Sequence, residues 1–220
     1  YVKLRTSLMF CMTADKERPC TSFAVTSAKP SEGKSLTAAN IAISYAMLGK
    51  KVLLIDADMR KPTQRRLWRV EKPTGLCDFL AKISKLELDK VKDLPLWIVC
   101  TGTIPPNPSE LLSSERMKHF VEESAKVYDY IIIDTPPINT VADAQIVSTY
   151  VDGVVLVVKS GDTTEDELNE AIDAVRRAGG NLCGTVLNDL NMKSVKYAYK
   201  YKYGGKYGYK YSYSESYEAR

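Results

Sequence analysis

The sequence predicts an α/β domain in which helices cover both faces of a mainly parallel, twisted sheet, followed by a flexible C-terminal tail. Two observations lead to this prediction. From residue 22 onward, short apolar runs alternate with longer amphipathic ones, and most of the apolar runs are continuous. Continuous apolar runs are typical of strands buried on both faces of a sheet. With 220 residues and 45% hydrophobic content, the chain can form one well-packed domain.

The alternation predicts six strands and three long helices. Strands are expected at residues 22–26, 51–56, 96–101, 130–134, 153–159 and 181–187. Helices are expected at residues 34–48, 109–127 and 165–178, and glycines at 49, 179 and 180 provide helix stops. Ligands of such sheets bind beyond the carboxyl ends of the strands, so the residues after each strand are the functional candidates.

Two segments lie outside this predicted core. Residues 1–20 are expected to form an N-terminal helix and a polar connection, and residues 21–192 form the main domain. Residues 193–220, called the tail below, are rich in Tyr, Lys, Gly and Ser and contain too few aliphatic residues to build a core. The tail carries seven Lys or Arg and two Glu, whereas the whole chain has a net charge of +4. The rest of the chain, residues 1–192, is therefore nearly neutral and needs no nucleic-acid partner.

The composition also restricts the cellular compartment and the kinds of metal site that the chain can form. No apolar run approaches the roughly 18–20 residues that a membrane-spanning helix needs. The five cysteines are scattered without CxxC spacing, which disfavours a disulfide framework or a zinc site and favours the reducing cytoplasm. The single histidine, His119, excludes multi-histidine metal chemistry.

A phosphate-binding loop follows the first predicted strand. Residues 28–35 read Ala-Lys-Pro-Ser-Glu-Gly-Lys-Ser and match the P-loop pattern GxxxxGK[ST], except that Ala28 replaces the first glycine. Lys34 is expected to reach the β and γ phosphate oxygens of ATP, and the Ser35 hydroxyl to ligate Mg²⁺. The loop residues expected to contact the phosphates are Ser31, Glu32, Gly33, Lys34 and Ser35. A chance GKS tripeptide is the alternative, but the position between a predicted strand and a predicted helix disfavours it.

Acidic residues close two further strands. Asp56 and Asp58 end the strand at 51–56, where by themselves they fit an ordinary loop equally well. Asp134 ends the apolar run at 130–134, as a Walker B aspartate does near magnesium. The sequence therefore predicts that these three carboxylates surround one magnesium nucleotide together with Lys34 and Ser35.

Four segments give the chain a family resemblance. The stretches AKPSEGKS, LLIDADMRKPT, TGTIPPNPSELL and YDYIIIDTPP resemble the bacterial tyrosine kinases, the cytoplasmic kinases of capsule and exopolysaccharide assembly systems. The resemblance covers nearly the whole chain. It implies a P-loop NTPase-type fold and an ATP- and Mg²⁺-dependent kinase that transfers phosphate to protein tyrosines.

The resemblance also implies roles for individual residues. Asp56 would accept or orient the tyrosine hydroxyl proton, while Asp58 and Asp134 would hold Mg²⁺ directly or through water. Arg60 would stabilise the local geometry or contact a phosphate. Asn188, which follows the last predicted strand, would contact adenine.

The tail holds a cluster of tyrosines. Its nine tyrosines are Tyr197, Tyr199, Tyr201, Tyr203, Tyr207, Tyr209, Tyr211, Tyr213 and Tyr217. Interleaved Tyr and Lys also suit a sticky or nucleic-acid-binding segment. Beside an ATP site, and by the resemblance, the cluster is expected to be autophosphorylated in trans and to regulate polysaccharide synthesis or export.

Two features keep other interpretations open. The family's ExxRxxR oligomerisation motif is incomplete, because Val2 stands where the first arginine is expected and only Arg5 remains. Lys29 lies where partitioning and septum-site ATPases carry their signature lysine. The alternative functions are therefore a switch ATPase of that type with a binding tail, or a nucleotide-binding scaffold without enzymatic activity.

The resemblance finally implies partners and a location. The partners are a transmembrane activator (a separate chain or an upstream part of the same chain), further copies in a homo-oligomer that could be a ring, a tyrosine phosphatase and exogenous protein substrates. The expected location is the cytoplasm, at the inner face of the cell membrane.

Overall fold

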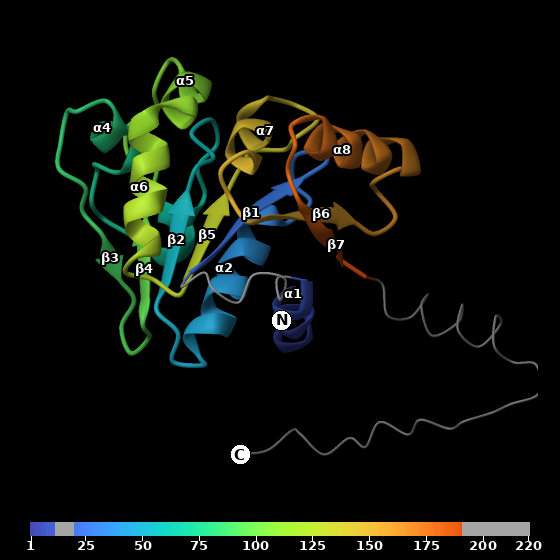
Figure 1. Cartoon of the computed structure of the whole chain (residues 1–220), viewed down its shortest axis with the longest axis horizontal. Coiled ribbons are helices and arrows are strands. Elements are labelled where there is room, and N and C mark those ends of the chain that lie inside the picture. The colour runs from blue at the N-terminus through green and yellow to red at the C-terminus, as the bar shows by residue number, and fades with distance from the viewer. Residues whose placement is uncertain (12–19, 191–220) are drawn as a thin grey trace, which may run out of the picture. The chain divides into compact units, whose positions relative to one another are not determined.

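A seven-stranded sheet forms the centre of the protein in the computed structural model, which describes residues 1–11 and 20–190 (Figure 1). The strands are β1 (Thr21–Ser27), β2 (Val52–Asp56), β3 (Asp89–Lys90), β4 (Leu96–Val99), β5 (Tyr130–Asp134), β6 (Gly153–Lys159) and β7 (Leu182–Asn188). Their order across the sheet is β3-β4-β2-β5-β1-β6-β7, and every neighbouring pair is parallel except β3 with β4. The predicted mainly parallel α/β fold is therefore confirmed.

Helices cover both faces of this sheet. They are α1 (Val2–Cys11), α2 (Lys34–Ala46), α3 (Gln64–Trp68), α4 (Leu76–Leu80), α5 (Pro108–Ser113), α6 (Glu115–Ala125), α7 (Asp143–Ser148) and α8 (Glu165–Arg177). Residues Tyr1–Asn188 form one compact unit. None of the helices among the described residues is long and apolar enough to cross a membrane. The predicted tail and the predicted polar connection at residues 12–19 lie outside the described residues, apart from Cys20.

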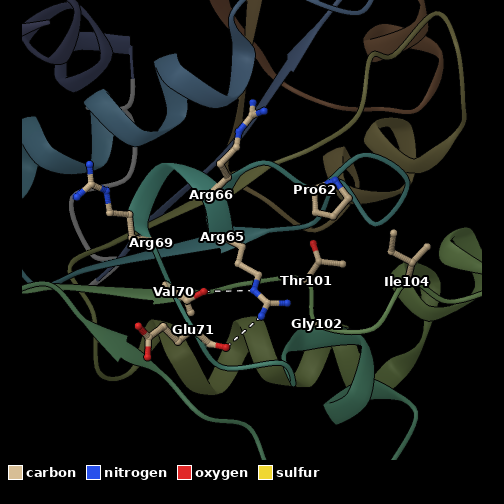
Figure 2. Close-up of a pocket in the computed structure, with 9 residues that line it drawn as sticks. All are labelled: Pro62, Arg65, Arg66, Arg69, Val70, Glu71, Thr101, Gly102 and Ile104. Carbon is tan, nitrogen blue, oxygen red and sulfur yellow. Dashed lines mark hydrogen bonds between the residues drawn. The ribbon is translucent and has the colours of Figure 1, made fainter.

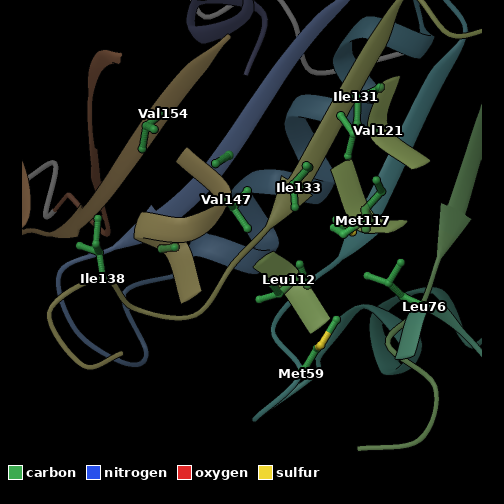
Figure 3. Packing of buried hydrophobic residues seen from close by; sticks show 14 of the residues in the cluster. Met59, Leu76, Leu112, Met117, Val121, Ile131, Ile133, Ile138, Val147 and Val154 are labelled. Atoms are coloured by element: carbon green, nitrogen blue, oxygen red, sulfur yellow. The ribbon is translucent and has the colours of Figure 1, made fainter. Parts of the chain in front are cut away.

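Two hydrophobic cores lie on opposite faces of the sheet, because successive side chains of a strand point to opposite faces. In β2, Leu53 and Ile55 belong to the core under α4 to α8, whereas Val52 and Leu54 belong to the core under α1 and α2. Figure 3 shows the first core, where residues of α6 and α7 pack against β5. The uninterrupted burial of both sets explains the continuous apolar runs.

The predicted helix at 109–127 is wrong in one respect: it is two helices, α5 and α6. The backbone of Ser114 is extended (ψ 146°), and its hydroxyl accepts a hydrogen bond from the Met117 amide (3.2 Å). Serine at this position ends one helix and caps the next. The prediction also missed α3, α4, α7 and β3, none of which exceeds six residues.

The strand register brings two predicted site residues together. Strand β5 lies between β1 and β2, and Asp56 is directly opposite Asp134 in the β2–β5 pair. The P-loop follows the carboxyl end of β1, the other neighbour of β5. The carboxyl ends of these three strands therefore meet at one edge of the sheet.

Candidate nucleotide and phosphoryl-transfer site

The loop between β1 and α2 has the conformation of a phosphate-binding loop. Gly33 precedes α2 with φ 89°, and a Cβ placed there would lie 2.2 Å from Asn188 Nδ2. Glycine is therefore required both by the left-handed backbone and by the close side chain. Asn188 Nδ2 donates to the Glu32 carbonyl oxygen (3.0 Å), so the end of β7 supports the loop. The first amides of the 13-residue helix α2 have no intrahelical acceptors and attract anions.

Lys34 is the buried cation of the site. Its Nζ lies 2.7 Å from Asp58 Oδ2 and 3.7 Å from Asp134 Oδ1, and it donates to Ser35 Oγ (3.1 Å). Burial disfavours the charged form, but the two carboxylates outweigh burial and raise the pKa of Lys34 above its usual value. Lys34 therefore stays protonated. When a nucleotide binds, the ammonium group of Lys34 can exchange contacts with these carboxylates for contacts with phosphate oxygens.

Asp56 is fully buried and is held by backbone amides. Its Oδ2 accepts from the Gln64 amide (3.0 Å) and its Oδ1 from the Asp58 amide (3.3 Å). Burial and the neighbouring Asp134 carboxylate raise the pKa of Asp56 to about 8. A carboxylate with a pKa near the working pH suits a general base, and a bound cation would lower this pKa.

Asp134 has an oxygen, Oδ1, that faces Lys34 at 3.7 Å without a hydrogen bond within the described part of the chain, and this oxygen tests the predicted magnesium site. The residue is fully buried, and Gln64 Nε2 donates to its Oδ2 (2.8 Å). Its Oδ1 has no hydrogen-bond partner among the described residues. Burial raises the pKa of Asp134, with Lys34 acting against the rise. An orphaned carboxylate oxygen, a hydroxyl at Ser35 and a second carboxylate at Asp58 form an oxygen-only donor set, which fits Mg²⁺.

Arg60 connects the site to α5 and α7. Its Nε and Nη2 donate to the two oxygens of Asp143 (2.8 and 3.1 Å), a buried residue at the start of α7. Ser109 of α5 donates to the same carboxylate (2.6 Å). These contacts fix the orientation of the Arg60 side chain, and both expected roles of Arg60 stay predictions.

A cavity of about 440 Å³, called the nucleotide cavity below, opens over the loop. Six of the predicted residues line it, namely Ser31, Gly33, Lys34, Ser35, Asp58 and Arg60. Asp56 and Asp134 are fully buried and do not line it. Glu32 is turned away from it, because its carboxylate accepts from the Lys29 amide (2.8 Å) and from the Thr163 hydroxyl. Glu32 therefore contributes its backbone and a structural side chain.

Sequence reasoning missed two residues that join this site. Gln64 contacts Asp56, Asp134 and the Ser35 carbonyl (3.0 Å), and thereby connects the ends of β2 and β5 with the start of α2. Asp143 orients Arg60. Both lie in short helices, α3 and α7. In the sequence, only their position after Asp58 and Asp134 indicates that they belong to the site.

Lys29 is held within its own chain. Its Nζ lies 3.1 Å from Glu167 Oε2 of α8 and donates to the Asp162 carbonyl oxygen (2.9 Å). In this conformation Lys29 joins the P-loop to α8 and to the loop before it.

Comparison with known proteins agrees with this geometry. The chain matches the AAA domain family over residues 21–181. It is 43% identical to the tyrosine-protein kinase YwqD of Bacillus subtilis over 202 residues, which cover 90% of this chain and 84% of that protein. The solved kinase domain of the Escherichia coli tyrosine kinase Etk superposes with a TM-score of 0.82 at 32% identity, covering 97% of this chain and 79% of that one. Full-length E. coli Etk is 37% identical over 201 residues, which are 89% of this chain but only 27% of that protein.

The cell-division ATPase MinD of Pyrococcus furiosus also superposes, with a TM-score of 0.65 at 21% identity over 78% of this chain and 73% of that one. That likeness shows a shared nucleotide-binding fold alone. The family is decided by the 43% identity to YwqD over most of both chains and by the superposition on the Etk kinase domain. The chain belongs to the bacterial tyrosine-protein kinases.

Proposed function

We propose that this kinase uses ATP and Mg²⁺ to phosphorylate the tyrosines of its own tail, between copies, and thereby regulates capsule or exopolysaccharide synthesis. The observation that carries the proposal is the buried cluster of Lys34, Asp58 and Asp134 at the mouth of the P-loop. Lys34 and the α2 amides would hold the phosphates. Ser35, Asp58 and Asp134 would hold Mg²⁺, which supplies neutralisation of the charge that develops on the transferring phosphoryl group.

Asp56 is the proposed acceptor of the tyrosine hydroxyl proton. Burial and Asp134 raise the pKa of Asp56 in the metal-free protein, and a bound cation would lower it, so that Asp56 would be ionised and still basic in the loaded site. Since Asp56 is fully buried and both its oxygens accept from amides, the role requires the turn at residues 58–64 to move when a tyrosine binds. Asn188 is the proposed adenine contact, although in this structure its amide supports Glu32.

The proposed partners extend beyond the chain. By the resemblance to kinases of capsule and exopolysaccharide assembly, we infer that a transmembrane activator works with this chain, as a separate chain or as an upstream part of the same chain. Such a partner would keep the kinase at the inner face of the membrane. A homo-oligomer would bring tails to neighbouring sites, a tyrosine phosphatase would reverse the reaction, and other proteins would serve as further substrates.

Intact mass spectrometry after incubation with Mg-ATP tests the proposal. Each transferred phosphoryl group adds about 80 Da, and peptide mapping should place the additions at the nine tail tyrosines. The same protein incubated with Mg-ADP is the control. Hydrolysis of ATP without any mass addition, with or without the activator, would instead support the switch-ATPase function.

A further inference from the structure

A second cavity, called the arginine pocket below, adjoins the nucleotide cavity. It has a volume of about 620 Å³ and lies between α3 with the residues after it and the loop after β4 (Figure 2). Arg66 lines both cavities. Cavities of this size hold ligands of the size of an amino-acid side chain or larger. No step of the proposed phosphoryl transfer uses this pocket.

Arg65 is a preorganised cation in the arginine pocket. Its Nε donates to the Val70 carbonyl (3.2 Å) and its Nη2 to the Glu71 carbonyl (3.0 Å), and Figure 2 shows the side chain directed toward the Thr101–Gly102 wall. A guanidinium has five N–H donors, and the remaining donors of Arg65 have no acceptor among the described residues. Both of its acceptors are neutral carbonyls, so its positive charge is available to an anion.

Two further arginines line the same pocket, and Figure 2 shows their side chains extended away from Arg65. Arg66 and Arg69 are exposed, and neither side chain forms an ion pair or hydrogen bond with any residue in the described ranges. Arg69 has a left-handed backbone (φ 55°) just after α3, a position at which glycine or asparagine is preferred. Glu71 is the single acidic residue lining the pocket, so the lining has a net positive charge.

The pocket also has an apolar wall. Pro62, Val70 and Ile104 line it, and Ile104 is 59% exposed. Apolar side chains offer a surface to an aromatic ring, and arginine can both stack on a ring and bind a phosphate with two hydrogen bonds. A ligand that uses every part of this lining carries a phosphate on an aromatic ring.

We propose that the arginine pocket binds a phosphotyrosyl side chain from the tail of another copy of this chain. The proposal rests on the proposed function, because tail phosphorylation supplies the ligand. The ring lies against Ile104 and Val70, and the phosphate binds Arg65 with Arg66 or Arg69 closing over it. Tail tyrosines recur at every second residue, as at Tyr207, Tyr209 and Tyr211. Binding of one phosphorylated tyrosine therefore holds the next unphosphorylated ones near the adjoining nucleotide cavity.

Fluorescence anisotropy with labelled synthetic peptides of residues 206–217 tests the binding. Three forms are compared: unmodified, phosphorylated on Tyr211, and phosphorylated on Ser212. The protein is the whole chain, dephosphorylated and saturated with Mg-ADP so that the nucleotide cavity is filled. We expect the phosphotyrosyl peptide to bind at least tenfold more tightly than either other form. Equal binding of the phosphoseryl peptide, or loss of binding on adding Mg-ADP, would overturn the proposal.

Matched arginine variants locate the binding site. Arg69→Gly removes one pocket charge and relieves the left-handed backbone, so it should keep or raise the thermal midpoint while weakening phosphopeptide binding several-fold. Arg65→Gln should weaken binding tenfold or more. Arg176→Gln is the control, since Arg176 is an exposed arginine on α8 with only a 3.7 Å ion pair to Asp173. Unchanged binding in a folded Arg69→Gly and Arg65→Gln double variant would refute the pocket assignment.

Failure of this proposal is distinguishable from failure of the proposed function. Synthetic phosphopeptides need no kinase activity, so their binding reports on the pocket alone. Mass additions after incubation with Mg-ATP report on the kinase alone. In an active kinase, pocket binding further predicts that multiply phosphorylated tails accumulate early in wild type, whereas Arg65→Gln first accumulates singly phosphorylated tails.

Discussion

Lys34 supplies the buried positive charge of the site. Replacing it by methionine removes the contact to the β and γ phosphates, where the transition state gathers charge. We expect Lys34→Met to lower tail phosphorylation by at least about 100-fold. The variant leaves Asp58 and Asp134 without their cation. The far-ultraviolet circular dichroism spectrum should nevertheless stay native, because Asp58 lines the cavity and Asp134 can take up a proton. Lys50→Met, an exposed lysine after α2, is the control. Normal phosphotyrosine levels in folded Lys34→Met would contradict the loop assignment.

Asp56 and Asp58 should differ in what their loss affects. Asp58 lines the nucleotide cavity, whereas Asp56 is fully buried. Asp58→Asn should weaken Mg-dependent ATP affinity more strongly, and Asp56→Asn should spare binding and lower turnover by about 100-fold or more, within the range of general-base catalysis. Calorimetric titration with and without Mg²⁺ measures the first effect and initial phosphorylation rates the second. Equal losses of affinity would show that this division of roles is wrong.

Asp56 also predicts a pH dependence of stability. Its folded pKa of about 8 lies above the value of about 3.9 in an unfolded chain. Between these values the folded state binds more protons than the unfolded state, so stability falls as the pH rises. In metal-free and nucleotide-free buffer, the thermal midpoint of Asp56→Asn minus that of wild type should therefore increase from pH 5 to pH 8.5. A constant difference between the two proteins would argue against the raised pKa.

At the scale of elements, Arg60, Asp143 and Ser109 join the turn after β2 to α5 and α7. Asp143→Asn and Arg60→Lys should each slow tail phosphorylation by about tenfold, because each breaks the two-point contact that positions Arg60. The double variant should be scarcely slower than either single one, since residues acting as a unit are not additive. Initial rates measure this cycle, and Asp166→Asn on the exposed start of α8 is its control. Additive losses would show that the two residues act independently.

The elements also show how far the sequence could predict this site. Every strand except β3, and the helices α2 and α8, were predicted, because strands buried on both faces are continuously apolar and these helices span several turns. Lys34, Asp56 and Asp134 were placed because each follows a predicted strand. Gln64 and Asp143 were not, because helices of five or six residues show no full period and the contacts depend on strand register. The division of residues 109–127 was missed because one serine hydroxyl decides it.

At the scale of the whole molecule, the sheet order bears on how the tail reaches an active site. β7 is an edge strand parallel to β6 and β1, and Asn188 at its end contacts the P-loop. Tyr197 follows Asn188 by nine residues, which span roughly 30 Å at full extension. In an oligomer, the tails of neighbouring copies would reach a high effective concentration at each site.

We therefore predict that tail phosphorylation occurs in trans. The experiment mixes an active protein that lacks residues 193–220 with a Lys34→Met protein that keeps its tail, and mass spectrometry follows the inactive partner. Phosphotyrosine on that partner, with an initial rate that rises with protein concentration, is the expected result. Each phosphate adds about −1.5 to −2 charge at neutral pH, so four or more would reverse the tail's charge of +5 and oppose its docking beside the acidic site. Native mass spectra should accordingly show smaller oligomers once tails carry four or more phosphates, whereas a single phosphotyrosine can still be bound by the arginine pocket of another copy. No labelling of the inactive partner, together with a concentration-independent rate in wild type, would establish transfer within one chain.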